Sequence, residues 1–414
     1  MFEKIYTDPS IISRHKSAPY KEKRERYLTH CERQGYSPST ILWLARELLW
    51  VARKLPPSFE QGMTIKQVEA LADGWEERER SWGQTLTLRY TRYRFIRVAR
   101  AWLRFLGYWR TPERSIPFAN LVENYRVWMK DERGFTSLTI DRRCGHLAHF
   151  LHWYGGRSCQ ISAVCLNDID AFLAYYGAKG NCRESVKNMA AALRAFFKYA
   201  GSQGWCAASI AHGIHGPRVF TQEQLPSGPS WQDVKRLISS METDRAVDIR
   251  DRAMVMLLAI YGFRAREVLA LRLEDFVWEQ NLISVLRVKG SRRQTYPLIP
   301  IVGNAIIRYL EDVRPPSSHR EIFLTLVPPF RPLAGGTLYP VTSKRMASLG
   351  IRVRHLGPHS LRHACAAHLV AEGFSLKEIG DHLGHRCSLA TRIYAKVDLP
   401  SLREVATFDI GGLI

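Results

Sequence analysis

The chain has 414 residues, with 60 Lys or Arg against 39 Asp or Glu, for a formal net charge of +21. This length predicts two or three domains, and a hydrophobic fraction of 46% is ordinary for a protein with buried cores. The positive charge attracts polyanions and favours nucleic acid as the partner. An anionic membrane is the rival partner, but no apolar run reaches the roughly 18 residues that a spanning helix needs.

The amino terminus and the cysteines favour a reducing compartment. Residues 1–27 lack the apolar core of a secretion signal. The eight cysteines are scattered and contain no Cys-x-x-Cys pair, which argues against a zinc module and against a disulfide framework. These features predict a cytoplasmic protein, and the positive net charge further predicts that it associates with the nucleoid.

Two stretches in the first half of the chain resemble each other. One begins at Tyr27 and the other at Tyr125. In both, a helix-like segment ends near a Gly-aromatic pair, and a Ser/Thr-rich signal then opens a second amphipathic helix. We interpret the pattern as a duplicated helical module of roughly a hundred residues, a common domain size. The alternative is a chance likeness between two amphipathic helix pairs.

Residues 86–105 predict an amphipathic helix whose polar face carries only arginine. On a helical projection, apolar side chains such as Phe95 and Trp102 fall opposite this face, and the segment contains no acidic residue. The arginines of the face are Arg89, Arg92, Arg97, Arg100 and Arg104. Such a face suits a row of phosphates, so we expect DNA binding here, with a plain solvated face as the alternative.

The helical pattern breaks after Trp205, in a stretch rich in Gly and Pro. Beyond it, helix-like segments surround two β-rich runs within residues 282–300, which a basic turn separates into a predicted hairpin. We expect a mainly α, multidomain protein in which helical DNA-binding modules precede an α+β domain with a small antiparallel sheet. The expected parts are an amino-terminal helical module (1–112), a second helical domain (113–207), a linker (208–226) and a final domain with its tail (227–414).

Six basic or polar residues of the final domain are candidates for a functional site. In chain order they are Arg264, Lys289, His359, Arg362, His385 and Tyr394. His359 and Arg362 lie three residues apart, so they share one face of a helix. Taken alone, Tyr394 could be an ordinary core residue, because buried tyrosines are common.

The ordered set resembles the tyrosine recombinases, the phage-integrase-like family. The matching motifs are a Gly-x-Arg-x-x-Glu segment at Arg264, a hairpin lysine, a His-x-x-Arg box, a Leu-Gly-His box and a tyrosine. Residues 118–206 also resemble the family's SAM-like core-binding domain. The chain departs from the family's minimal pattern by its additional amino-terminal module.

The resemblance implies cleavage and rejoining of duplex DNA through a 3′-phosphotyrosyl bond, with Tyr394 as the nucleophile. Arg264 and Arg362 would hold the non-bridging phosphate oxygens, where negative charge builds up in the transition state. Lys289 would protonate the departing 5′-oxygen as a general acid.

The remaining polar residues have supporting roles in this interpretation. His359 would assist proton transfer from the nucleophile, and His385 would donate a hydrogen bond to the phosphate. Glu267 would orient its neighbours. We interpret His363 and His368 as structural residues.

No cofactor is expected, because the sequence offers neither a Walker A loop nor an evident carboxylate cluster for a metal. The resemblance further implies double-stranded DNA as the partner and a homotetramer, or a mixed recombinase assembly, in which the tail at residues 398–414 docks on a neighbouring subunit. The additional module favours integration or transposition of a mobile element. A type IB topoisomerase and a non-catalytic DNA-binding regulator are the alternatives.

Overall fold

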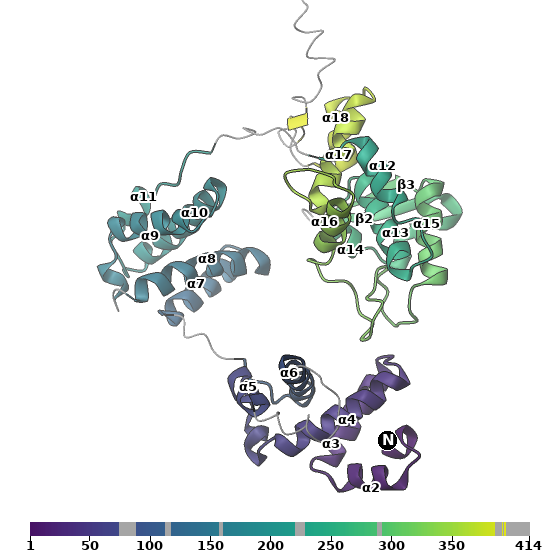
Figure 1. Cartoon of the computed structure of the whole chain (residues 1–414). Coiled ribbons are helices and arrows are strands. Elements are labelled where there is room, and N and C mark those ends of the chain that lie inside the picture. Colours follow the sequence, from purple (N-terminus) through teal and green to yellow (C-terminus); the bar gives the residue numbers. More distant parts are fainter. Residues whose placement is uncertain are drawn as a thin grey trace, which may run out of the picture. The chain divides into compact units, whose positions relative to one another are not determined.

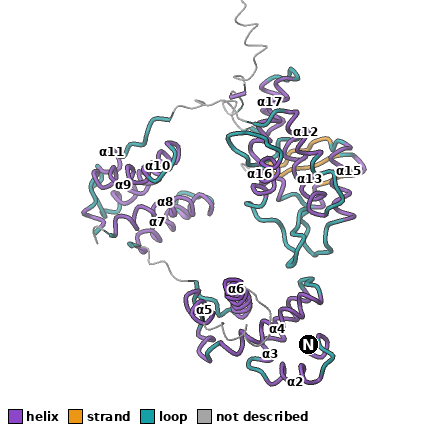
Figure 2. Tube along the Cα trace, viewed as in Figure 1, coloured by secondary structure: helices purple, strands orange, loops and turns teal. Residues whose placement is uncertain are grey.

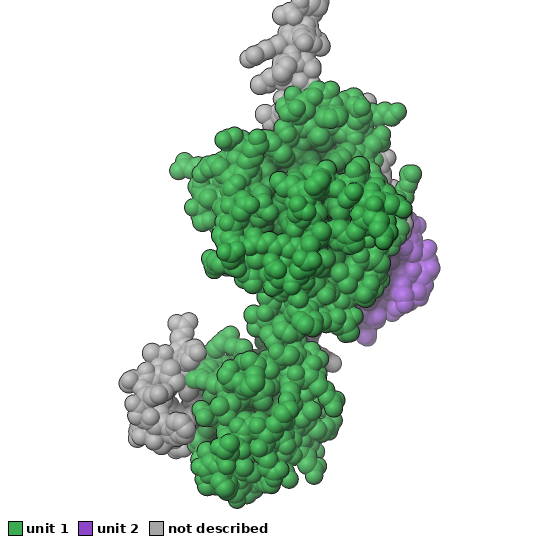
Figure 3. All heavy atoms as spheres, turned by 90° about the vertical axis from the view of Figure 1, so that its right-hand side faces the viewer, with its two compact units in different colours: residues 1–110, 224–414 green, residues 111–223 purple. Residues whose placement is uncertain are grey.

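The computed structural model describes most of the chain. The described residues are 1–73, 88–111, 117–156, 160–219, 228–287, 292–385, 391, 393 and 394, and the side chains of residues 88–91 are not included. The chain divides into two compact units, residues 1–110 with 224–414, and residues 111–223 (Figure 3). Helices make up most of both units (Figure 2). Within the described ranges, no helix is long and apolar enough to cross a membrane.

The amino-terminal module is helical. Its elements are α1 (Phe2–Ile5), α2 (Pro9–Ser17), α3 (Lys21–Arg33), α4 (Pro38–Lys54), the 3-10 turn η1 (Pro57–Gln61), α5 (Ile65–Asp73) and α6 (Leu88–Leu106). Their apolar faces form one core, in which Leu48, Phe59 and Trp102 are fully buried. Helix α6 is amphipathic as predicted, because Phe95 is buried while Arg97 is exposed.

The middle unit contains α7 (Ala119–Asp131), α8 (Ser137–Gly155), the 3-10 turn η3 (Ile161–Ala163), α9 (Leu166–Ala178), α10 (Arg183–Ser202) and α11 (Ile210–Gly213) (Figure 1). Aromatic rings fill its core. Phe150 makes edge-to-face contacts with Phe172, at a centroid distance of 5.3 Å, and with Phe197, at 5.7 Å. Such ring pairs add to the stabilisation that comes from burying apolar area.

The two similar stretches of the sequence share one junction geometry. Gly35 and Gly134 end α3 and α7 with positive φ angles of 84° and 58°, a conformation that favours glycine. Two residues later, Ser37 and Thr136 cap the next helix by accepting a backbone N–H with their side-chain oxygens. The likeness in sequence therefore corresponds to a likeness in local structure.

The final domain combines helices with a three-stranded antiparallel sheet of order β1-β2-β3. Its helices are α12 (Trp231–Ser239), α13 (Ala246–Ile260), α14 (Ala265–Leu269), α15 (Pro300–Asp312), α16 (Leu338–Ser348), α17 (Pro358–Ala371) and α18 (Leu376–Leu383). The strands are β1 (Phe276–Val277), β2 (Leu282–Arg287) and β3 (Arg292–Pro297), with the 3-10 turns η4 (Leu273–Asp275) and η5 (Trp278–Gln280) around β1. Helix α13 is buried on nearly all sides and packs against α12, α15 and α17.

Candidate active site

Arg264 stands at the start of a short helix and is held there by the third residue of that helix. It is the N-cap of α14, and the carboxylate of Glu267 accepts its backbone N–H at 2.9 Å. The same carboxylate accepts a second hydrogen bond from Nη1 of Arg264 at 2.8 Å. The Arg264 side chain keeps 28% of its surface exposed. Its position is thus fixed while one side stays open to a ligand.

The side chain of Glu267 is completely buried, and its carboxylate forms ion pairs with two arginines. Its Oε2 also accepts from Nη1 of Arg287 at 2.8 Å. Burial alone raises the pKa of Glu267, but the Arg264 N–H and the charges of both arginines outweigh it and lower the pKa below its ordinary value. The carboxylate is therefore ionised at neutral pH, as the predicted orienting role requires.

Arg287 belongs to this cluster, and the sequence analysis missed it. It ends β2 with 5% of its surface exposed, and it donates to the carbonyl of His382 at 3.0 Å and to the Tyr296 hydroxyl. The alternation of the strand could have identified Arg287 as buried, because residues 283, 285 and 287 lie on the buried face of β2. A charged residue on the buried face of a strand needs a partner, and here that partner is the carboxylate of Glu267.

Arg362 is fixed by backbone carbonyls. It is 2% exposed, and its guanidinium donates to the carbonyls of Gly262 at 2.5 Å and Leu383 at 2.8 Å. Burial and the nearby charge of Arg264 lower its pKa to about 10, so it remains a cation at neutral pH. Gly262 has a φ of +61°, and a Cβ there would run into Leu383. The close approach of these segments thus requires glycine.

Tyr394 packs in a small apolar cluster with residues of α17 and α18. It is 2% exposed, and its neighbours include Cys365 and Leu383. Its hydroxyl forms a hydrogen bond with Nδ1 of His363 at 2.9 Å. Burial raises the pKa of Tyr394 to about 12, and the charge of Arg362 opposes this rise in part. The phenol is therefore protonated at neutral pH.

The predicted histidines lie beside this cluster. His359 is exposed, and its ring lies 4.5 Å from that of His363. His385 follows α18, and its Nδ1 shares a hydrogen bond of 2.7 Å with the Thr391 hydroxyl. Burial, followed by the charges of nearby arginines, lowers the pKa of His385 to about 4. His385 is thus neutral near pH 7 and can still donate one N–H.

His363 and His368 differ from each other in the structure, although the sequence analysis interprets both as structural. His368 stacks on Trp231 at a centroid distance of 3.9 Å and so packs α17 against α12. His363 instead contacts the Tyr394 hydroxyl. Which histidine faces the tyrosine depends on how the segment near residue 394 packs on α17, and helical spacing alone does not determine this.

Lys289 lies outside the described residues, within the segment 288–291. The strands on either side of that segment are paired, and Arg287 and Arg292 face each other at its two ends. Within the described ranges, no group of three or more His, Cys, Asp or Glu side chains is arranged to hold a metal ion.

Comparison with known proteins assigns the chain to a family. The sequence profile of the phage integrase family matches residues 230–399, and that of the phage integrase N-terminal SAM-like domain matches residues 122–204. The putative integrase/recombinase y4rA of Sinorhizobium fredii is 33% identical over 288 residues, which cover 69% of this chain and 69% of that protein. The chain belongs to the tyrosine recombinase family. It is a tyrosine-type site-specific recombinase, an enzyme of DNA strand breakage and rejoining.

Other relatives agree with this assignment. The tyrosine recombinase XerD of Listeria monocytogenes is 27% identical over 291 residues, covering 69% of this recombinase and 97% of XerD. The solved structure of the XerH recombinase bound to a palindromic difH substrate has a TM-score of 0.54 at 21% identity, over 69% of this chain and 83% of that one. The Tn1549 transposon integrase with circular intermediate DNA has a TM-score of 0.53 at 18% identity, over 69% and 99%. These likenesses confirm the predicted fold class.

The amino-terminal module of the recombinase precedes both matched segments, and its arginine face is less uniform than predicted. Arg92 forms an ion pair with Asp73 of α5 at 2.7 Å, and the side chain of Arg89 lies outside the described residues. Arg97, Arg100 and Arg104 are exposed. The last two lie over the ring of Trp109, each 5.7 Å from its centroid.

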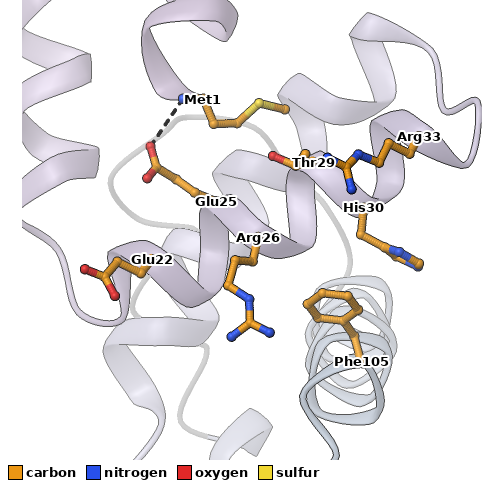
Figure 4. Close-up of a pocket in the computed structure, with 8 residues that line it drawn as sticks. All are labelled: Met1, Glu22, Glu25, Arg26, Thr29, His30, Arg33 and Phe105. Carbon is orange, nitrogen blue, oxygen red and sulfur yellow. Dashed lines mark hydrogen bonds and ion pairs between the residues drawn. The ribbon is translucent and has the colours of Figure 1, made fainter.

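A cleft of about 560 Å³ lies beside α6, between that helix and α3. Figure 4 shows Arg26, His30 and Arg33 of α3 along this cleft, with Phe105 of α6 beside the His30 ring. The two rings are 4.8 Å apart. The cleft also carries the acidic Glu22 and Glu25, so its charge is mixed.

Helix α10 of the middle unit carries a basic stripe that the sequence analysis did not identify. Its members are the exposed residues Arg183, Lys187, Arg194 and Lys198. Their spacing of four, seven and four residues keeps them on one face of the helix. A cleft of about 350 Å³ beside the stripe is also lined by Arg218. Summing charges along each predicted helix face, as for residues 86–105, could have found this stripe.

Proposed function

We propose that this recombinase cleaves a DNA strand by attack of the Tyr394 oxygen on a backbone phosphorus, with Arg264 and Arg362 as the phosphate-binding cations. One observation carries the proposal. The hydroxyl of Tyr394 lies 2.9 Å from Nδ1 of His363, the residue that follows Arg362 in α17, and Arg362 donates to the carbonyl of Leu383, which belongs to the same apolar cluster as Tyr394. A phosphodiester at that cation would be next to the phenol.

The proposed cleavage step exchanges one phosphorus–oxygen bond for another. A bond forms between the tyrosine oxygen and phosphorus, and the bond from phosphorus to the 5′-oxygen breaks. The phenolic proton leaves for a base, and the 5′-oxygen gains a proton, for which Lys289 is the proposed donor. Because the phosphotyrosyl bond retains the bond energy, a 5′-hydroxyl can reverse the step and rejoin a strand without another energy source.

Two groups of arginines and lysines support duplex DNA as the partner. The α10 stripe and the exposed Arg97, Arg100 and Arg104 of α6 present rows of cations, which suits contacts with phosphates; the exposed acid beside the α10 stripe is Glu184. The solved relatives are described as bound to DNA, for instance XerH on difH and the lambda integrase dimer on a core site. We propose the same partner here, and an oligomeric assembly on it.

We propose that the recombinase acts at the cytoplasmic nucleoid as a homotetramer, or as a mixed assembly, in which the tail at residues 398–414 docks on a neighbouring subunit. We favour integration or transposition of a mobile element because the amino-terminal module is additional to the family's minimal pattern, and chains of similar fold include lambda integrase and the Tn1549 transposon integrase. A type IB topoisomerase activity is the second candidate, because it would use the same chemistry.

Covalent capture tests the proposal. The full-length protein is incubated with a pool of nicked duplexes from the DNA that flanks its coding region, supplemented with randomised duplexes. We expect a protein–DNA adduct whose modified peptide contains Tyr394 by mass spectrometry. Tyr394→Phe should abolish the adduct while leaving DNA affinity in place.

The control outcomes are distinct. An adduct on another residue, or a wild-type level of adduct from Tyr394→Phe, would contradict the assignment of the nucleophile. Relaxation of a supercoiled plasmid of unrelated sequence by dilute protein would instead favour the topoisomerase candidate.

A further inference from the structure

The hydroxyl of Tyr394 and the ring of His363, a residue outside the six motif positions, form a hydrogen bond. The Nδ1 atom of His363 lies 2.9 Å from the hydroxyl oxygen, and the ring centroids are 5.7 Å apart. This distance is within the range in which a side chain can accept a proton directly. Among the described residues, His363 makes the side-chain hydrogen bond to this hydroxyl, whereas His359 contacts the His363 ring.

In the free protein both partners of this hydrogen bond are neutral near pH 7, with the proton on Tyr394 and an acceptor nitrogen available on His363. Burial, followed by the charges of His359, Arg362 and His355, lowers the pKa of His363 to about 4, so the ring is neutral near pH 7. A neutral imidazole has one nitrogen that accepts a hydrogen bond. The phenol, with its pKa raised to about 12, keeps its proton until a base removes it.

We infer that His363 is a further catalytic residue, which accepts the phenolic proton of Tyr394 as the tyrosine oxygen attacks phosphorus. This inference rests on the proposed function. The proton moves from the tyrosine oxygen to Nδ1 of His363, which becomes an imidazolium. The proton returns to the tyrosine oxygen when a 5′-hydroxyl displaces it in the rejoining step. The role differs from the sequence expectation, in which His359 assists the nucleophile.

The surroundings of His363 couple this step to DNA. Its charged and titratable neighbours are His359, His355 and Arg362, and each of them opposes a positive charge on the ring. A phosphodiester bound at Arg362 would bring a negative charge that offsets this opposition. Bound DNA would therefore increase the tendency of His363 to take up a proton relative to the free protein.

The test uses His363→Ala and His363→Asn in the full-length protein, with covalent capture on the duplex that the wild type captures best. Asparagine can keep a hydrogen bond near the Nδ1 position but cannot take up the proton. We expect both variants to bind the duplex normally and to form the adduct about 10²- to 10⁴-fold more slowly. The matched control, His368→Gln on the same helix, should react at the wild-type rate.

A more acidic nucleophile separates a base from a positioning residue. Difluorotyrosine at position 394 lowers the pKa of the phenol, so it reduces the need for a base. We expect this replacement to restore most of the lost rate in His363→Ala and His363→Asn at neutral pH. A rise in pH should also accelerate the variants more than the wild type.

Three outcomes would overturn the inference. Wild-type capture rates in both variants would remove His363 from the reaction. Full activity of His363→Asn without difluorotyrosine would show that the residue only positions Tyr394. Rescue of His359→Ala, but not of the His363 variants, by difluorotyrosine would assign the proton to His359. In each case the wild type still forms an adduct at Tyr394, whereas failure of the proposed function would eliminate that adduct.

Discussion

The carboxylate of Glu267 and the guanidinium of Arg287 form an ion pair of 2.8 Å in the interior of the final domain. The second oxygen of the carboxylate binds Arg264, so one acid joins a buried arginine of the sheet to a phosphate-binding arginine of the proposed site. Arg287 also donates to the carbonyl of His382, just before the turn that carries His385. It thus connects the sheet, α14 and the end of α18.

Arg287→Met should therefore affect both folding and catalysis. Removing one partner of a buried ion pair leaves an uncompensated charge and typically costs about 3–5 kcal/mol. We expect a loss of that order in the free energy of unfolding, measured in urea, together with slow covalent capture. Arg292→Met, at the exposed cross-strand position, is the matched control. Equal unfolding midpoints for both variants would contradict the structural role.

Variants of the proposed general acid and of the phosphate-binding arginines should differ in how their cleavage rates depend on the leaving group. Arg264→Ala and Arg362→Ala leave charge on the phosphate oxygens without compensation, so they should slow cleavage of every substrate. Lys289→Ala should be slow on normal DNA but recover when the bridging 5′-oxygen is replaced by sulfur, because a thiolate leaves without a proton. Single-turnover capture on the two substrates measures the difference. Failure of sulfur to rescue Lys289→Ala would assign the proton to another donor.

The sequence predicted those parts of the site that depend on local pattern. The Gly-x-Arg-x-x-Glu segment at Arg264 and the Leu-Gly-His box at His385 are signals within a few neighbouring residues, and the start of α4 follows from a Ser/Thr-rich signal. The partner of Arg92 was not predictable in the same way. Asp73 belongs to a different helix, and helical periodicity predicts which face is polar but not which neighbour packs against it.

His363 and Arg287 illustrate two further limits. His363 directly follows Arg362, yet its contact with Tyr394 depends on tertiary packing across 31 positions of the chain. Arg287 could have been recognised, because a charged residue at an inward position of a strand requires a buried partner. The carboxylate of that partner, Glu267, is 20 residues away and on a helix. Sequence alternation indicates that such a partner exists, but it does not identify the residue.

The amino-terminal module should lose stability in mild acid because of His15. This ring is 2% exposed and lies between Phe2 and Tyr6, at centroid distances of 5.0 and 4.8 Å. Burial, followed by the charge of Arg24, lowers its pKa from 6.5 to about 4. The unfolded chain therefore binds a proton at a higher pH than the folded one, so stability is complete above pH 6.5 and falls as the pH drops toward 4.

The loss attributable to His15 is at most about 3.5 kcal/mol, since its pKa falls from 6.5 to about 4 and one pKa unit corresponds to about 1.4 kcal/mol. Urea unfolding followed at several pH values, with His15→Phe as the comparison, measures it. The variant should show a flatter dependence on pH in this window. His30→Phe, at an exposed position of the same module, should leave the dependence unchanged. Identical pH profiles for the wild type and His15→Phe would contradict a neutral, buried His15.

The arginines of α6 should contribute to DNA affinity without regard to sequence. Arg97, Arg100 and Arg104 are exposed and lie on one face of the helix, and two of them are supported by the ring of Trp109. Arg92 is a poorer choice for substitution, because Asp73 already neutralises it. Each phosphate contact that is lost should lower the slope of log affinity against log salt by about 0.9.

The triple variant Arg97→Gln, Arg100→Gln and Arg104→Gln should therefore weaken binding almost equally for specific and random duplexes, and it should reduce the salt slope. The matched control carries three Gln substitutions at the exposed Arg14, Lys21 and Arg53 of the same module, so its net charge changes equally. Salt-titrated binding of both variants separates a local contact from a general effect of charge. Equal slopes in the two variants would show that the α6 face is only solvated. The amino-terminal module would then be better explained as a surface for assembly with other protein subunits.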